Sequence, residues 1–129
     1  MKQCIAFLFI ATAVTLTACH KSVSVSQQHK LKARFEIAGL CSNYTFSLTE
    51  GNLDTSLVVG SWTNPSTDKT YKNAFGVSNP CSLPSNLKEG DEFYFEIVPE
   101  RQSNCAVCMA YYPTPPKKLN IKVLEVVKK

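Results

Sequence analysis

Apolar and polar residues alternate with a period of two in four stretches of the chain. In the first of them, Leu31, Ala33 and Phe35 are separated by Lys32 and Arg34. Such alternation is typical of β-strands with one buried face, and these stretches are rich in aromatic and β-branched residues. The predicted strands cover residues 31–38, 44–49, 93–98 and 119–127, with weaker strand patterns at 57–62, 71–77 and 107–112.

Turn-forming residues separate these stretches. Clusters containing Gly, Pro, Asn, Asp or Ser occur at 50–52, 64–66, 79–80, 89–91 and 113–116. No segment of this region carries apolar residues at the spacing of an amphipathic helix. The sequence therefore predicts an all-β fold, a small antiparallel β-sandwich or barrel of about seven short strands. The pattern alone does not choose between these two architectures.

Residues 1–18 have the composition of a secretory signal peptide. A single positive charge at Lys2 precedes an apolar run from Cys4 to Ile10, and the following residues are small or apolar. The whole stretch is shorter than the ~20 residues that a membrane-spanning helix requires. We therefore expect 1–18 to be removed from the mature protein.

The segment ends in Leu16-Thr17-Ala18-Cys19, which resembles the lipobox of bacterial lipoproteins. The resemblance covers these four residues and implies that Cys19 carries acyl chains, palmitate among them, and becomes the first residue after cleavage. Two or three chains, at about 0.8 kcal/mol per buried CH₂, make membrane attachment effectively permanent. His20 stands where enterobacterial lipoproteins of the inner membrane carry aspartate. The resemblance thus implies an outer-membrane anchor that faces the periplasm.

The rest of the chain divides into a tether and one domain. Residues 19–30 are polar and rich in Ser and Gln, which indicates a flexible tether behind the lipid. Residues 31–129 suit a single disulfide-stabilised β-rich domain of common size. The net charge of the chain is only +4, and its Lys and Arg residues form no nucleic-acid motif. We expect no nucleic-acid partner.

Four cysteines lie in the predicted domain: Cys41, Cys81, Cys105 and Cys108. In a small exported domain, disulfides compensate for a limited core. In extended backbone, Cys105 and Cys108 are about 10 Å apart at Cα, beyond the ~7 Å that a disulfide spans. We therefore expect two structural disulfides in which Cys105 and Cys108 each pair with Cys41 or Cys81. The sequence does not choose between the two connectivities.

Two other uses of the Cys105/Cys108 pair remain open at this level. A thiol-redox pair usually opens a helix, whereas the residues after Cys108 start a helix poorly and end at Pro113. A copper or zinc site would find soft ligands in the two thiolates and in Met109. The alternative function is therefore thiol-redox or metal handling in the envelope. The favoured interpretation requires no metal and no cofactor.

The predicted domain lacks the residues of common hydrolytic mechanisms. The histidines, His20 and His29, both lie in the tether, so none can act as a base beside a serine or cysteine nucleophile of the domain. The sequence also contains no metalloprotease, Walker or dinucleotide-binding motif. We expect no enzymatic activity and no catalytic residues.

Aromatic residues are the candidate binding groups. Trp62, Tyr111 and Tyr112 have amphipathic rings and lie in weak strands or beside loops. Exposed rings of this kind bind protein surfaces or stack on sugars, whereas buried ones complete a core. The sequence thus predicts a membrane-anchored lipoprotein of the cell envelope with a non-enzymatic binding or structural domain. Its expected partners are the membrane, through the lipid, and an envelope protein or glycan.

Overall fold

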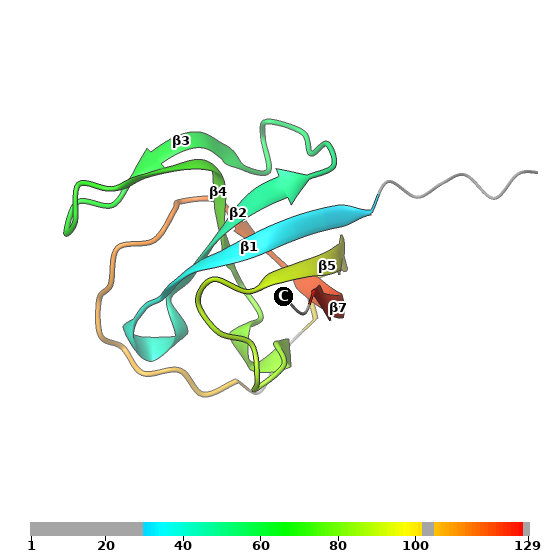
Figure 1. Cartoon of the computed structure of the whole chain (residues 1–129). Coiled ribbons are helices and arrows are strands. Elements are labelled where there is room, and N and C mark those ends of the chain that lie inside the picture. Colours follow the sequence, from blue (N-terminus) through cyan, green and yellow to red (C-terminus); the bar gives the residue numbers. More distant parts are fainter. Residues whose placement is uncertain (1–29, 102–104, 128–129) are drawn as a thin grey trace, which may run out of the picture.

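The computed structural model describes residues 30–101 and 105–127 and has the predicted all-β architecture (Figure 1). In chain order its elements are β1 (Leu31–Ala38), the 3₁₀ turn η1 (Leu40–Ser42), β2 (Tyr44–Glu50), β3 (Val59–Thr63), β4 (Thr70–Val77), the 3₁₀ turn η2 (Pro80–Ser82), β5 (Glu92–Ile97), β6 (Lys118–Leu119) and β7 (Ile121–Val127). The predicted signal peptide, Cys19 and nearly all of the tether lie outside the described residues.

The strands form one sheet that closes on itself. Hydrogen-bonded neighbours follow the order β3-β4-β2-β1-β5-β7, and β6 pairs with β4. Because only Asn120 separates β6 from β7, this last stretch joins β5 to β4 and completes a ring of strands. Among the described strands, each pairing is antiparallel except the parallel pairing of β4 with β6. The sheet is thereby rolled into a small barrel.

Phenylalanine side chains fill the barrel. The ring of Phe46, on β2, lies 4.8 Å from Phe35 and 5.7 Å from Phe75 between centroids. It also meets Phe93 of β5 edge-on at 5.5 Å, although β2 and β5 are not hydrogen-bonded neighbours. Opposite walls of the barrel therefore pack face to face, as the two layers of a sandwich do. Burial of each such ring contributes about 1.5–3 kcal/mol.

Asn79 completes the hydrogen bonding where β4 ends. Its Nδ2 donates to Ile121 O at 2.7 Å, and its Oδ1 accepts from Ile121 N at 3.0 Å. The buried amide side chain thus takes the place of a neighbouring strand at the start of β7. This pair of bonds holds η2 against the closing strand.

A β-bulge moves one apolar residue of β1 to the outer face of the barrel. The register passes from Phe35 opposite Phe46 to Ile37 opposite Thr45, which leaves Glu36 without a partner in β2. Side chains alternate along a strand, so this shift places Ile37 on the opposite face from Phe35. A second buried cluster forms there. Its members are Ile37, Tyr71 and Ala74, with Trp62 and Tyr112 packed against them.

The connection from β5 to β6 crosses the surface as an irregular segment. Residues 105–117, which we call the strap, contain no strand, so the strand predicted at 107–112 is wrong. The prolines of the strap supply no N–H for a strand ladder. Its end is nevertheless well anchored, because Pro115 is fully buried and Gly76 N donates to Lys117 O at 2.8 Å. In Figure 1 the strap is the orange trace along the lower and left edges.

Candidate functional site

Two disulfides attach the strap to the barrel. Cys41 of η1 is bonded to Cys108, with Cα atoms 4.9 Å apart, and Cys81 of η2 is bonded to Cys105, with Cα atoms 5.7 Å apart. Cys105 and Cys108 therefore belong to different bridges, which is one of the two connectivities predicted from their spacing. Since η1 follows β1 and η2 follows β4, the bridges fix the strap to the ends of two barrel strands.

Local hydrogen bonds shape η1 for its bridge. Cys41 and Ser42 have φ angles of 55° and 60°, in the left-handed region that few non-glycine residues adopt. Asn43 Nδ2 donates to Leu40 O at 2.8 Å and to Ala110 O at 3.4 Å. A single amide group thus closes the turn and holds the strap beside it.

The segments that the bridges join carry no charge. In the sequence, residues 37–49, 73–87 and 102–116 contain no Lys, Arg, Asp, Glu or His, and each bridged cysteine lies in one of these stretches. The disulfides bring the three stretches together on the folded domain. The surface so formed, which we call the neutral face, consists of residues 39–43, 78–83 and 105–116.

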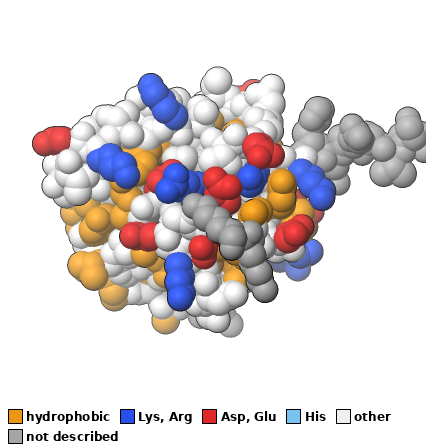
Figure 2. Space-filling model, in the orientation of Figure 1, with side chains coloured by type: hydrophobic (Ala, Val, Ile, Leu, Met, Phe, Trp, Pro, Cys, Tyr) orange, Lys and Arg blue, Asp and Glu red, His pale blue; other side chains and the backbone are white. Residues whose placement is uncertain are grey.

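Large apolar side chains of the neutral face project into solvent. Met109 is 97% exposed, Tyr111 86%, Leu40 67% and Val107 45%. Figure 2 shows hydrophobic side chains gathered along the lower left edge of the molecule, where the strap runs in Figure 1. Protein interfaces are depleted of charge at their centre and enriched in Met and Tyr. The neutral face has this composition on a covalently fixed backbone.

A cavity of about 250 Å³ lies beside the Cys81 bridge. Its walls come from both 3₁₀ turns and their neighbours and include Ser42, Tyr44, Pro80 and Leu83. None of the residues that line it is charged. At protein interfaces, such cavities receive the anchoring side chains of a partner.

The structure separates the three aromatic residues that the sequence proposes for binding. Tyr111 projects into solvent, whereas Trp62 and Tyr112 are half-buried against the second cluster. The ring of Trp62 lies 5.9 Å from that of Tyr71, which completes this packing. Sequence reasoning misses Leu40, although the lack of charge around each cysteine is a signal that could have located it.

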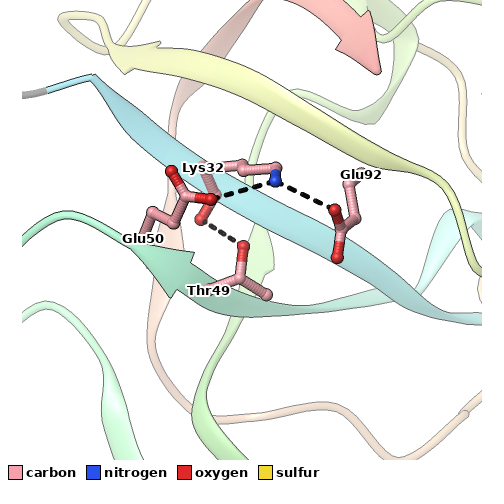
Figure 3. A network of polar contacts seen from close by, with 4 residues as sticks. All are labelled: Lys32, Thr49, Glu50 and Glu92. Carbon is pink, nitrogen blue, oxygen red and sulfur yellow. Dashed lines mark hydrogen bonds and ion pairs between the residues drawn. The ribbon is translucent and has the colours of Figure 1, made fainter. Parts of the chain in front are cut away.

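A polar network braces the outer face of the barrel away from the strap (Figure 3). Lys32 Nζ of β1 lies 3.0 Å from Glu50 Oε1 of β2 and 3.0 Å from Glu92 Oε2 of β5. Thr49 Oγ1 donates to Lys32 O at 3.2 Å. The hydrogen bond to Glu92, followed by that to Glu50, raises the pKa of Lys32 well above its usual range. This lysine thus joins three neighbouring strands while remaining charged.

Neither a metal-binding cluster nor a free thiol is found among the described residues. Residues 30–101 and 105–127 contain no group of three or more His, Cys, Asp or Glu side chains placed to hold a metal ion. The four cysteines are all oxidised, so none presents a thiolate. No helix in this part of the chain has the length and apolar character needed to cross a membrane.

Comparison with known proteins identifies no relative of the chain. No family model matches the sequence, and neither the curated proteins nor the solved structures include a significant match.

Proposed function

We propose that the chain is a membrane-anchored lipoprotein of the bacterial cell envelope, lipidated at Cys19, whose domain binds another envelope protein through the neutral face. The single observation that carries the binding role is the exposure of Met109 and Tyr111, at 97% and 86%, on a segment tied down by two disulfides. Solvent-exposed apolar side chains on a fixed segment lower the entropic cost of docking. The domain acts by binding, without catalysis.

The composition of the neutral face favours a protein partner over a lipid surface or a glycan. Contact with anionic lipid headgroups draws on Lys and Arg, and the neutral face has neither. A glycan site needs many side-chain hydrogen-bonding groups, whereas three large exposed side chains of this face, Met109, Leu40 and Val107, are apolar. The partner that best complements this face is a protein with an apolar surface that inserts a side chain into the cavity beside Cys81.

Thiol-redox or copper and zinc handling by Cys105 and Cys108 is the rival function. Each of these cysteines is bonded to a different partner, so a free pair would require both disulfides to open. Alkylation of the protein directly from native membranes, followed by mass spectrometry, distinguishes the two functions. The proposal expects no free thiols. Thiols that become reactive only after a chelator is added would favour the metal function instead.

The anchor is tested separately from the binding surface. Globomycin, which blocks lipoprotein signal cleavage, should cause an unprocessed precursor to accumulate, and a Cys19→Ser variant should lose incorporation of labelled palmitate. Normal processing in the presence of globomycin would contradict the anchor and the envelope location that depends on it.

The binding role is tested by comparing two sets of exposed apolar residues. Native gel electrophoresis of gently solubilised membranes should show the wild-type chain in a complex with a second protein. The Met109→Ser/Tyr111→Ser variant should run as the free chain, because truncation of interface anchors costs about 2 kcal/mol or more. A Leu124→Ser variant, which removes a 52% exposed side chain on β7, should stay in the complex.

Three outcomes would contradict the binding role. They are a wild-type chain that runs free, a double variant that stays in the complex, and a complex that contains only copies of this chain. The last outcome would replace the partner protein with self-association.

A further inference from the structure

A shallow groove of about 350 Å³ lies on the outer face of β1, β2 and β4, apart from the neutral face. Arg34 lines it from β1, Ser47 and Thr49 from β2, and Lys69 and Lys72 from β4 and the turn before it. The bulged register of β1 contributes Glu36 to the same groove. Three of the four charged residues that line it are basic, in contrast to the uncharged cavity beside Cys81.

Three cations of the groove, Arg34, Lys69 and Lys72, form no ion pair with the described residues. The ion pairs of the described residues involve Lys32 and Lys122, and none involves Arg34, Lys69 or Lys72. Lys69 Nζ lies 4.9 Å from the centroid of the Tyr71 ring, a cation–π contact that keeps its charge near the groove wall. With three cations against the one carboxylate of Glu36, the concave surface has an excess of positive charge, which attracts an anionic group.

The hydroxyl groups of the groove add hydrogen-bonding capacity. Thr49 Oγ1 donates to Lys32 O at 3.2 Å, and Thr70 Oγ1 lies 2.8 Å from Thr63 Oγ1. Each hydroxyl oxygen has two lone pairs, so both can still accept a hydrogen bond from a ligand. The carboxylate of Glu36 is a stronger acceptor for a ligand hydroxyl, and it would repel a densely charged polyanion.

We propose that this groove binds an acidic saccharide, a sugar that carries a carboxylate or phosphate group. The acidic group lies among Arg34, Lys69 and Lys72, and a sugar hydroxyl donates to Glu36. The proposal is independent of the neutral face, since the two surfaces share no residue.

Four probes test the ligand class on the isotopically labelled full chain, with amide chemical shifts as the readout. Tetragalacturonate supplies carboxylates and glucose 6-phosphate supplies a phosphate, while maltotetraose and inorganic phosphate are the neutral-sugar and simple-anion controls. At least one acidic sugar should shift groove amides, and the one that does identifies the acidic group. Maltotetraose should shift none, and inorganic phosphate should bind at least tenfold more weakly. Equal binding of inorganic phosphate, or no shifts with either acidic sugar, would overturn the proposal.

Matched variants locate the site. Arg34→Gln/Lys69→Gln/Lys72→Gln should weaken binding of the acidic sugar roughly tenfold, since each exposed charge pair contributes a small factor. Lys88→Gln/Lys118→Gln/Lys122→Gln removes the same net charge outside the groove and should leave affinity unchanged. Glu36→Gln should weaken binding of the acidic sugar but strengthen binding of inorganic phosphate. Equal losses in the two triple variants, with near-UV circular dichroism unchanged, would show non-specific attraction and overturn the site.

Discussion

At the scale of single residues, Lys32 determines how the outer face responds to pH. Hydrogen bonds to Glu92 and Glu50 raise the pKa of its ammonium group in the folded state. A group whose pKa is raised by folding contributes its full stabilisation below its unfolded pKa, about 10.4 for lysine. That stabilisation is lost only as the pH rises through the higher folded-state value.

Replacing Lys32 with Met should therefore lower Tm by a constant amount from pH 7 to about pH 10, because lysine stays protonated over that range. Above this range the difference from the wild-type chain should shrink. Thermal unfolding followed by circular dichroism across pH measures it. Lys122→Met is the control, since its ion pair with Glu96 is longer, at 3.4 Å, and its side chain is 66% exposed. A difference that disappears between pH 7 and 9 would contradict the role of Lys32.

Gly39 lies tightly against the Tyr112 ring of the strap. A β-carbon there would collide with the backbone oxygen of Asn43 and with the ring of Tyr112. At Gly60, on β3, a β-carbon would meet no atom within 4 Å. The two glycines thus form a matched pair for testing whether the strap is tightly packed.

Gly39→Ala should destabilise the domain by about 1–3 kcal/mol, the usual cost of overpacking, and should displace the Tyr112 ring. Gly60→Ala should be neutral or slightly stabilising, because alanine loses less conformational entropy on folding. Urea unfolding without reductant gives both values. Equal stabilities of the two variants would mean that the strap moves aside at little energetic cost, and would contradict tight packing at Gly39.

At the scale of elements, the strap depends on covalent links more than on strand pairing. The bridges close loops with sequence separations of 67 and 24 residues. If the bridges act by restricting the unfolded chain, removing them costs the domain about 4 kcal/mol for the longer loop and about 3 kcal/mol for the shorter one. The strap contains no strand, so it forms few backbone hydrogen bonds with the sheet.

Removing one bridge at a time tests this view. Cys81→Ser/Cys105→Ser should lower the free energy of unfolding by about 3 kcal/mol, and Cys41→Ser/Cys108→Ser should lower it by about 4 kcal/mol. Urea unfolding measures the loss, and hydrogen exchange should rise first in strap amides. Losses below about 1 kcal/mol would show that packing alone holds the strap.

Sequence patterns predict the strands in which apolar and polar residues alternate. The alternation in 31–38 and 44–49 reports one buried face, and both stretches are strands. The same reasoning fails at 107–112, because an apolar run is compatible with a strand and equally with an irregular segment held by disulfides. The sequence of β1 alone does not predict the bulge before Ile37, because the bulge depends on how β1 pairs with β2.

At the scale of the whole molecule, closure of the barrel and assembly of the neutral face both depend on contacts distant in sequence. Cysteine spacing predicts two bridges between Cys105 or Cys108 and the earlier cysteines, and the structure agrees. It does not predict that three charge-free stretches meet, or that Tyr111 points outward while Tyr112 packs inward. Those features arise from the path of the strap across the folded barrel.

The central claim is that the neutral face contacts another envelope protein, and site-specific photocrosslinking in living cells tests it most directly. A photoreactive amino acid replaces Tyr111 in one strain and Leu124 in another, both exposed positions, the second on β7 away from the strap (Figure 1). The account predicts one discrete adduct from position 111, with the same partner identified in repeated experiments, and none from position 124. The absence of an adduct at 111, or the same adducts at both positions, would contradict it.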